Sequence, residues 1–364
     1  MSIERHNWST QEILDIYNKP LMELLYEAAT IHREHHDPNT VQVSTLLSIK
    51  TGGCPEDCGY CPQAARYHTD IEGNDLMSVQ QVKAQALRAK SSGSSRVCMG
   101  AAWRNVKDGP EFDQVLEMVR TINKLDMEVC CTLGMLTENQ AQRLAEAGLY
   151  AYNHNLDTSE DYYKDVISTR AFEDRLETID NVRKSNVTVC SGGIIGMGEA
   201  VEDRAGMLVA LSTLNPQPES VPINALVAVE GTPMEEMPPI PIWDMIRMVA
   251  TTRIVMPKTQ VRLSAGRTEM SREGQAMCFF AGANSIFAGD KLLTTPNPDV
   301  NADMEMFKLL GLNPQKPFVK VAQPETVEAE DSNYNSLGEK PKWTRPGHTI
   351  ERNETAKAKA KITD

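Results

Sequence analysis

The sequence predicts an α/β protein built as a (β/α)8 TIM-type barrel. Short runs rich in β-branched residues alternate with amphipathic stretches, and eight such strand and helix units follow one another about 35 residues apart. A doubly wound sheet is the alternative, but its nucleotide-binding turn would need Gly-x-Gly-x-x-Gly after the first strand, and the residues after position 50 lack it. The alternation therefore favours the barrel.

The chain divides into three predicted regions. Residues 1–40 should form two helices that cap one end of the barrel, because Ser9 to Glu12 have the pattern of a capping box and leucines recur at helical spacing after it. Residues 41–317 should form the barrel. Residues 318–364 are rich in Glu, Asp, Asn, Lys and Pro without apolar periodicity, so we expect a disordered polar tail.

The elements of the barrel follow from the hydrophobic pattern. The predicted strands are residues 41–50, 96–101, 127–133, 150–156, 187–194, 221–227, 260–264 and 284–287. The predicted helices are residues 79–89, 113–123, 138–147, 172–182, 203–211, 243–255, 272–280 and 304–310. In such a barrel, functional residues gather where the strands end.

Composition restricts the partners and the compartment. A net charge of −13 and a pI near 5.1 argue against nucleic acid or an anionic membrane surface, since both reward clustered Lys and Arg. No apolar run approaches the roughly 20 residues of a membrane helix, and residues 4–7 do not resemble a signal-peptide core. We therefore expect a cytoplasmic protein, in which eight cysteines serve metal binding or catalysis rather than disulfides.

Three cysteines stand close together directly after the first predicted strand. Cys54, Cys58 and Cys61 lie within a turn that contains Gly52, Gly53 and two prolines. A structural zinc site would need a second cysteine pair farther on, and none follows. Three thiolates alone suit a cubane iron-sulfur cluster with one iron left open for a small molecule. The alternative is a cysteine-rich loop without a metal.

The strands separate an apolar face from a polar face, because alternate residues point to opposite sides of a sheet. On the polar side we place Arg96 and Cys98, then Cys130 and Thr132, then Asn153, Asn155 and Asp157, then Thr188 and Cys190, then Ser220 and Asn224, and finally Gln260, Arg262 and Ser264. Opposite them we place valines, leucines, Tyr150, Tyr152 and Cys131. The apolar face must meet the helices, so the polar face points into the barrel. Burying so many polar groups is costly unless a bound ligand satisfies them.

Four of the inward residues form a second candidate metal site. Cys98, Cys130, Cys190 and Arg262 come from four different strands. A single buried cysteine is most often a small hydrophobic residue, but three on one polar face favour a metal. Arginine does not readily lose its proton, so it is an unusual fourth member. Cys131 and Cys278 are expected to be structural, and His32, His35 and His36 to be solvated without a role.

Two further stretches suggest small-molecule binding. The strand at 150–156 ends in Asn153-His-Asn155-Leu-Asp157, whose amides could bind a urea-like ring and whose carboxylate could bind ribose hydroxyls. The alternative is strand-end capping. The glycine-rich run from Gly192 to Glu199 would allow the backbone to approach a flat ligand, although glycine turns after strands are common.

With Cys54-x3-Cys58-x2-Cys61 and an aromatic Tyr60 before the last thiol, the chain resembles the radical S-adenosylmethionine enzymes. Five segments narrow this to a resemblance to the biotin synthase family, over roughly residues 8–315 as judged from these motifs. The segments are Ser48 to Cys58, Cys98 to Trp103, Tyr152 to Thr158, Val189 to Gly193 and Val261 to Arg267. The set of Cys98, Cys130, Cys190 and Arg262 is the most specific part.

The resemblance implies a reaction and two clusters. Cys54, Cys58 and Cys61 would hold a 4Fe-4S cluster that cleaves S-adenosylmethionine to a 5'-deoxyadenosyl radical. That radical would take hydrogen from dethiobiotin, and sulfide from a 2Fe-2S cluster on Cys98, Cys130, Cys190 and Arg262 would be inserted to form biotin. The expected partners are a flavodoxin- or ferredoxin-type electron donor, the iron-sulfur assembly machinery and a second copy of the chain.

The resemblance also implies contacts for the two small molecules. S-adenosylmethionine would meet the residues that match the family's cofactor motifs, which are Tyr60, Ala101, Ala102, Trp103, Asn155, Asp157, Gly192, Ile194, Gly196 and Glu199. Dethiobiotin would meet Asn153, Asn155 and Asn224 through its ureido ring, and Thr294 and Thr295 through its carboxylate.

Two rival functions remain at this point. Another radical enzyme with this barrel, such as a hydrogenase maturase or a methylornithine-type mutase, would keep the first three cysteines but would not need the second set. A non-catalytic iron-sulfur or zinc carrier would have no cofactor pocket, which the Asn155, Asp157 and glycine-rich constellation argues against.

Overall fold

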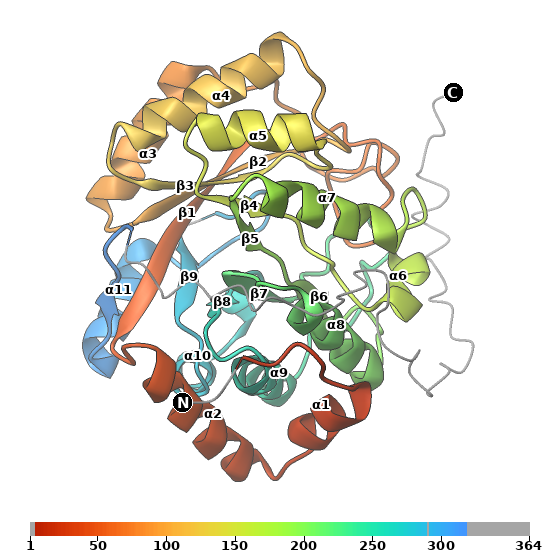
Figure 1. Cartoon of the computed structure of the whole chain (residues 1–364), viewed down its shortest axis with the longest axis vertical. Coiled ribbons are helices and arrows are strands. Elements are labelled where there is room, and N and C mark those ends of the chain that lie inside the picture. The colour runs from red at the N-terminus through yellow and green to blue at the C-terminus, as the bar shows by residue number, and fades with distance from the viewer. Residues whose placement is uncertain (1–3, 290, 319–364) are drawn as a thin grey trace.

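The structure is a computed structural model that describes residues 4–289 and 291–318 (Figure 1). Its centre is a closed ring of parallel strands in the order β1-β2-β3-β4-β5-β7-β8-β9, with β9 pairing back to β1. The short strand β6 pairs beside β7, and β10 extends the start of β1. The prediction of a (β/α)8 barrel is confirmed.

The ring strands have bounds close to those predicted. They are β1 (Thr40–Lys50), β2 (Arg96–Ala101), β3 (Glu128–Thr132), β4 (Ala151–Asn153), β5 (Thr188–Cys190), β7 (Ser220–Ala225), β8 (Gln260–Leu263) and β9 (Ser285–Ala288). The two strands outside the ring are β6 (Gly193–Ile195) and β10 (Asn313–Pro314). The strand predicted at 187–194 is broken into β5 and β6 at Ser191 and Gly192. A Cβ on Gly192 would lie 2.0 Å from the carbonyl oxygen of Pro222, so the backbone of β7 comes too close here for any other residue.

The helices surround the ring (Figure 1). They are α1 (Thr10–Tyr17), α2 (Leu21–His35), α3 (Val79–Ser91), α4 (Pro110–Asn123), α5 (Glu138–Glu146), α6 (Glu160–Val166), α7 (Phe172–Lys184), α8 (Val201–Thr213), α9 (Ile242–Val255), α10 (Arg272–Phe280) and α11 (Val300–Leu310). The sequence reading missed α6, whose seven residues are too few to establish a helical period.

Helices α1 and α2 lie on the outside of the ring. The Ser9 capping box predicted for α1 is present, and the two helices pack against α8 and α9. Figure 1 shows them at the periphery, beyond α9 and not across the mouth of the barrel. Their apolar residues therefore meet other helices, and the helical cap at residues 1–40 stays a prediction. The tail predicted from residue 318 lies outside the described residues beyond that position.

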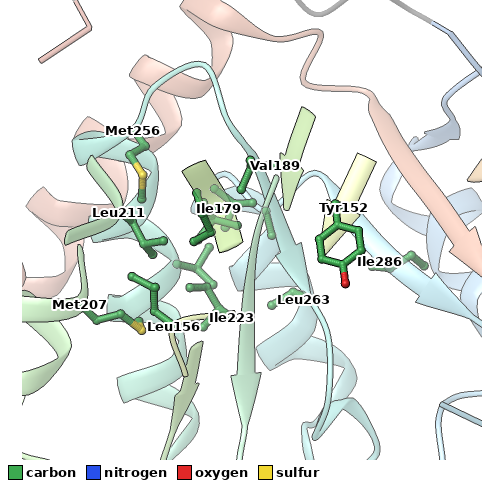
Figure 2. Close-up of a cluster of buried hydrophobic side chains, with 14 of the residues drawn as sticks. Tyr152, Leu156, Ile179, Val189, Met207, Leu211, Ile223, Met256, Leu263 and Ile286 are labelled. Carbon is green, nitrogen blue, oxygen red and sulfur yellow. The ribbon is translucent and has the colours of Figure 1, made fainter. Parts of the chain in front are cut away.

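The main apolar core fills the space between the ring and its helices. Figure 2 shows part of it, where Val189 and Ile223 from the strands lie close to Ile179 and Leu211 from α7 and α8. Cys131 belongs to this core, as predicted, and Cys278 of α10 is buried there too. The interior of the ring holds a separate small apolar cluster that includes Cys98 and Cys130. Strand alternation therefore assigns inside and outside correctly at these positions.

One residue of the alternation was assigned to the wrong side. Tyr150 was grouped with Tyr152, but it packs against the interior cluster. Cζ of the Arg96 guanidinium lies 4.9 Å from the centre of the Tyr150 ring. Tyr150 precedes β4, so the pleat does not yet govern its direction. Arg96 pairs there with Glu128 at 2.8 Å and Glu219 at 2.9 Å, so buried ion pairs close the amino-terminal end of the interior.

The histidines of α2 also differ from expectation. His32 is 4% exposed, and His36 accepts a hydrogen bond at Nε2 from Arg253 and lies within hydrogen-bonding distance of Asn284 and the carbonyl of Pro257. They were expected to be solvated because a helix before a turn is usually at the surface. Helix α9 covers this end of α2 instead, and the two histidines form part of the joint between them.

Candidate active site

A cavity of about 320 Å³ opens at the carboxyl ends of the strands, where a barrel places its functional groups. Both sets of cysteines reach it. Of the predicted site residues, its wall contains Cys54, Cys58, Tyr60, Cys61, Cys98, Ala101, Ala102, Trp103, Cys130, Asn153, Asn155, Asp157, Ile194, Asn224, Arg262, Thr294 and Thr295. Cys190, Gly192, Gly196 and Glu199 are not part of this wall, but Cys190 and Gly192 contact Asn153 and Asn155, which are.

The first three cysteines lie on a loop that folds back on itself after β1. Gly52 and Gly53 have φ values of 75° and 70°, which begin the turn. The amide of Cys54 donates to the carbonyl of Gln63 at 3.0 Å, and the amide of Cys61 donates to the carbonyl of Cys58 at 3.0 Å. All three thiols reach the cavity from this one loop.

The thiols of Cys54, Cys58 and Cys61 are buried and therefore difficult to ionise without a bound metal. Burial raises the pKa of the Cys58 thiol to about 11, and burial also raises the pKa values of Cys54 and Cys61. A metal ligand must be a thiolate, so the positive charge of iron would have to displace these protons. Among the described residues, no three Cys, His, Asp or Glu side chains converge tightly enough for one metal ion. The spread suits a polynuclear cluster, in which each sulfur binds a different iron.

The second set converges inside the ring. Cys98 and Cys130 are direct partners across β2 and β3. A hydrogen bond with Cys130, followed by the positive charges of Arg262 and Arg96, lowers the pKa of the Cys98 thiol. Nη1 of Arg262 lies 3.6 Å from the sulfur of Cys190. The strand alternation thus assigned to one interior four residues that lie far apart in the chain, between Cys98 and Arg262.

Arg262 is held without a carboxylate partner among the described residues. Its Nε donates to Ser285 at 2.9 Å, its Nη2 donates to Gln42 at 2.9 Å, and its guanidinium lies over the ring of Phe287. A buried cation is costly unless a negative charge accompanies it. Three thiols and one uncompensated guanidinium fit an anionic iron-sulfur group at this position.

The amide side chains form one connected wall. Asn153 donates to the sulfur of Cys190 at 3.2 Å and to Oδ1 of Asn155 at 3.1 Å. Asn224 donates to the carbonyl of Gly193 at 2.9 Å and accepts from the amide of Ala265 at 3.1 Å. These contacts hold the amides against the backbone, so their orientation is set before any ligand enters.

Asp157 is paired more tightly than the sequence suggested. It has φ of 69°, follows β4 and forms an ion pair with Arg175 of α7, which also donates to the hydroxyl of Tyr163 at 2.9 Å. The sequence reading did not include Arg175, because a single arginine inside an amphipathic helix pattern carries no signal. Both residues line the cavity.

The glycine-rich stretch acts mainly through the backbone. The amide of Gly192 donates to Oδ1 of Asn155 at 3.2 Å. The carboxylate of Glu199 accepts from the amides of Gly196 and Met197 and pairs with Arg204 at 2.8 Å. Glu199 thus holds the turn that follows Ile194, and Ile194 is the member of this group that reaches the cavity.

Several other residues of the cavity were not anticipated. Glu56, Gln63, His154, Arg170 and Leu293 line it. Glu56 and Gln63 flank the predicted cysteines, so the motif itself could have indicated them. Arg170 lies in the connection between α6 and α7, where no sequence pattern indicated a functional group.

Family models match most of the described chain. Residues 48–210 match the Radical SAM superfamily, and residues 222–313 match the Biotin and Thiamin Synthesis associated domain. A biotin synthase from Flavobacterium psychrophilum is 85% identical over 361 residues, covering 99% of this chain and 100% of the relative. The chain belongs to the biotin synthase family. A biotin synthase from Flavobacterium johnsoniae is also 85% identical, with 98% and 99% covered.

The comparison with solved structures concerns the barrel. A solved structure of methylornithine synthase has a TM-score of 0.71 and 17% identity, and covers 85% of this chain and 94% of that one. At that identity the likeness shows the barrel alone. The rival functions considered from the sequence give way to the biotin synthase family, a group of radical S-adenosylmethionine enzymes, and membership implies a 4Fe-4S cluster and S-adenosylmethionine. No helix among the described residues has both the length and the apolarity to span a membrane.

Proposed function

We propose that this chain makes biotin from dethiobiotin with two iron-sulfur clusters in one cavity. Cys54, Cys58 and Cys61 would hold the 4Fe-4S cluster, and Cys98, Cys130, Cys190 and Arg262 the 2Fe-2S cluster. When bound, these groups and S-adenosylmethionine supply a 5'-deoxyadenosyl radical that removes hydrogen from dethiobiotin and the sulfide that takes its place. The supporting observation is that thiols of both sets line the same cavity.

The protein's own part is to hold the substrate between the two cysteine sets. Asn153, Asn155 and Asn224 offer fixed amide groups to the ureido ring, which needs both donors and acceptors. Asn153 also bonds to the sulfur of Cys190, so the same side chain would relate the position of the ring to that of the second cluster. Holding reacting groups at fixed separation lowers the barrier without any chemistry by the side chain.

The opposite end of dethiobiotin would be held by Thr294 and Thr295, which follow β9 and line the cavity together with Leu293. Two hydroxyl groups can donate to a carboxylate, and the leucine would cover the apolar chain. Leu293 of this loop reaches β2, since a Cβ on Gly100 would lie 2.7 Å from its side chain, and we infer that the loop covers the cavity there. Covering the site excludes water from a radical.

S-adenosylmethionine would lie nearer the first cysteines. Ala101, Ala102 and Trp103 follow β2 beside the methionine end, and Tyr60 lies between two of the cysteines in sequence. Asn155 and Asp157 would meet the ribose, with Asp157 oriented by Arg175. Gly192, Ile194, Gly196 and Glu199 would form the adenine side, where Glu199 holds the turn.

Arg262 would hold the second cluster without exchanging a proton. Guanidinium stays charged under ordinary conditions, so its role is electrostatic. Ser285 and Gln42 aim it at the sulfur of Cys190. Its positive charge would offset the negative charge of three thiolates and bound sulfide, which supports it as the fourth member of the set.

The remaining assignments are also proposals. We infer a helical region at residues 1–40 and a barrel at residues 41–317, with function in the second region. The reaction needs electrons and a supply of iron and sulfide, so we propose a flavodoxin- or ferredoxin-type donor and the iron-sulfur assembly machinery as partners. A homodimer and a cytoplasmic location follow from the family resemblance.

The decisive experiment is an anaerobic assay of reconstituted protein. We expect dethiobiotin to be converted to biotin, with methionine and 5'-deoxyadenosine formed. Cys98→Ala should stop biotin formation but keep the 4Fe-4S spectrum, because it removes a ligand of the second set only. Mössbauer spectra count and distinguish the clusters. An iron content unchanged by Cys98→Ala would contradict the second cluster.

A further inference from the structure

A charged connection between α6 and α7 clamps the loop of the first three cysteines. The carboxylate of Asp57 accepts from the amides of Ser168 at 2.8 Å and Thr169 at 3.1 Å. The amide of Gly59 donates to the carbonyl of Val166 at 2.9 Å. Asp57 is fully buried and has no role in the proposed chemistry. Its hydrogen bonds join two segments separated by more than a hundred residues.

The same connection carries Arg170, whose side chain approaches Cys58, a proposed cluster ligand. Nη2 of Arg170 lies 3.9 Å from the sulfur of Cys58, within the range of an N–H···S contact. The side chain is 7% exposed and lines the cavity, and its buried Nε lacks a hydrogen-bond partner among the described residues. A buried donor without a partner is costly, so a group bound in the cavity is expected to accept from it.

The positive charge of Arg170 is only loosely compensated. The nearest carboxylate is Glu56, with a nitrogen-oxygen distance of 3.9 Å, and Glu56 lies closer to Arg104 at 3.3 Å. Arg175, the other arginine of this wall, is paired with Asp157. Among the residues that the structure describes, Arg170 is therefore the cation of this corner that is available to act on Cys58.

We propose that Arg170 is a positioning residue that sets the reduction potential of the cluster on Cys54, Cys58 and Cys61. This inference rests on the proposed function of those cysteines. Donation to a ligand sulfur and a nearby positive charge both stabilise the more negative, reduced cluster, so they raise its potential. Asp57 and Glu56, the two acidic residues between the first cysteines, would serve to hold the clamp and to orient this guanidinium.

The test compares Arg170→Gln, Arg170→Lys and the matched control Arg66→Gln in anaerobically reconstituted protein. Arg66 is a neighbouring arginine that pairs with Asp57 at 3.7 Å, but its side chain is 42% exposed, where solvent screens its charge. Redox titration followed by the electron paramagnetic resonance of the reduced four-iron cluster gives the midpoint potential. Iron content and circular dichroism are measured on every sample.

We expect Arg170→Gln to lower the equilibrium constant for one-electron reduction about tenfold, which is about 59 mV toward more negative potential. Arg170→Lys should recover part of the shift, and Arg66→Gln should change it little. A potential in Arg170→Gln no different from that of the control would overturn the inference, as would an equal shift in Arg170→Lys. Failure of both folded variants to take up iron would also overturn it, because lysine keeps the charge.

The same measurements separate this inference from the proposed function. If the unaltered protein shows no four-iron signal, the proposed cluster is wrong. If that signal is present but the Arg170 variants have the same midpoint potential as the unaltered protein, the cluster stands and the proposed role of Arg170 is wrong. If Arg170→Gln alone loses its iron while Arg170→Lys retains it, Arg170 serves to retain the cluster and not to set its potential, and the inference is overturned.

Discussion

At the scale of single residues, the adjacent pair Cys130 and Cys131 shows how much one position along a strand decides. Both are fully buried, but Cys130 faces Cys98 inside the ring and Cys131 packs in the core under the helices. Residue type and burial are identical. Only the pleat of β3 distinguishes a proposed cluster ligand from a structural thiol.

This pair gives a direct test of the strand direction. Cys130→Ala should abolish the 2Fe-2S signal and biotin formation, since it removes a proposed ligand. Cys131→Ala should keep both and cost about 1 kcal/mol of stability, because a small cavity forms in the core. Iron analysis and the biotin assay on both variants decide it, and equal damage would show that the assigned direction of β3 is wrong.

At the scale of elements, α11 is attached to the barrel through one buried ion pair. Arg267, just after β8, pairs with Asp303 of α11, and both side chains are fully buried. Arg267 also donates to the carbonyl of Phe287 at 3.0 Å. The same guanidinium thus joins α11 to the end of β9, next to the loop with Thr294 and Thr295.

Loss of the Arg267–Asp303 ion pair should lower the free energy of unfolding substantially. Asp303→Asn leaves a buried cation without its charge partner, and we expect about 3–5 kcal/mol less free energy of unfolding. Urea denaturation of the apoprotein measures it. The control is Glu117→Gln, which removes an exposed ion pair with Arg120 and should change stability by no more than about 1 kcal/mol. Equal losses in the two variants would count against a special role for α11's attachment.

At the scale of the whole molecule, the joint between α2 and α9 should make stability depend on pH. Burial, followed by the positive charge of Arg253, lowers the pKa of His36 to about 2, and burial lowers that of His32 to about 3. Burial likewise lowers the pKa of Arg253 to about 9. Protonation of His32 or His36 in the folded protein is therefore unfavourable.

The sign of the dependence follows from proton binding. Below about pH 6.5 the unfolded chain protonates these histidines, whereas the native state keeps them neutral, so stability is complete above that pH and falls as the pH falls. Each histidine contributes up to about 1.4 kcal/mol per pH unit. His36→Gln keeps an acceptor for Arg253 but cannot titrate, so it should reduce the slope of unfolding free energy between pH 6 and 4. Exposed His68→Gln is the control, and equal slopes in the two variants would contradict the assignment.

Much of the site was predictable because it depends on local order. Cys54, Cys58 and Cys61 are adjacent in the chain, and their grouping needs no fold. Cys98, Cys130, Cys190 and Arg262 are far apart, but regular alternation and parallel pairing carry a strand residue to the inside wherever the strand is intact. Where a strand had not begun, at Tyr150, the rule failed. Where a short helix and its connection intervened, at Arg170, there was no period to read.

By itself, the sequence determined the barrel, the grouping of the first three cysteines and the inward face of the second set, since these follow from hydrophobic period and spacing. Tertiary structure alone decided which charges compensate one another. Asp157 is held by Arg175, Arg262 has no carboxylate partner in the described part of the chain, and Arg170 reaches Cys58 from a distant connection. Such pairs depend on the distances between side chains that the fold brings together, and electrostatic interactions change steeply with distance and burial. No local pattern encodes them.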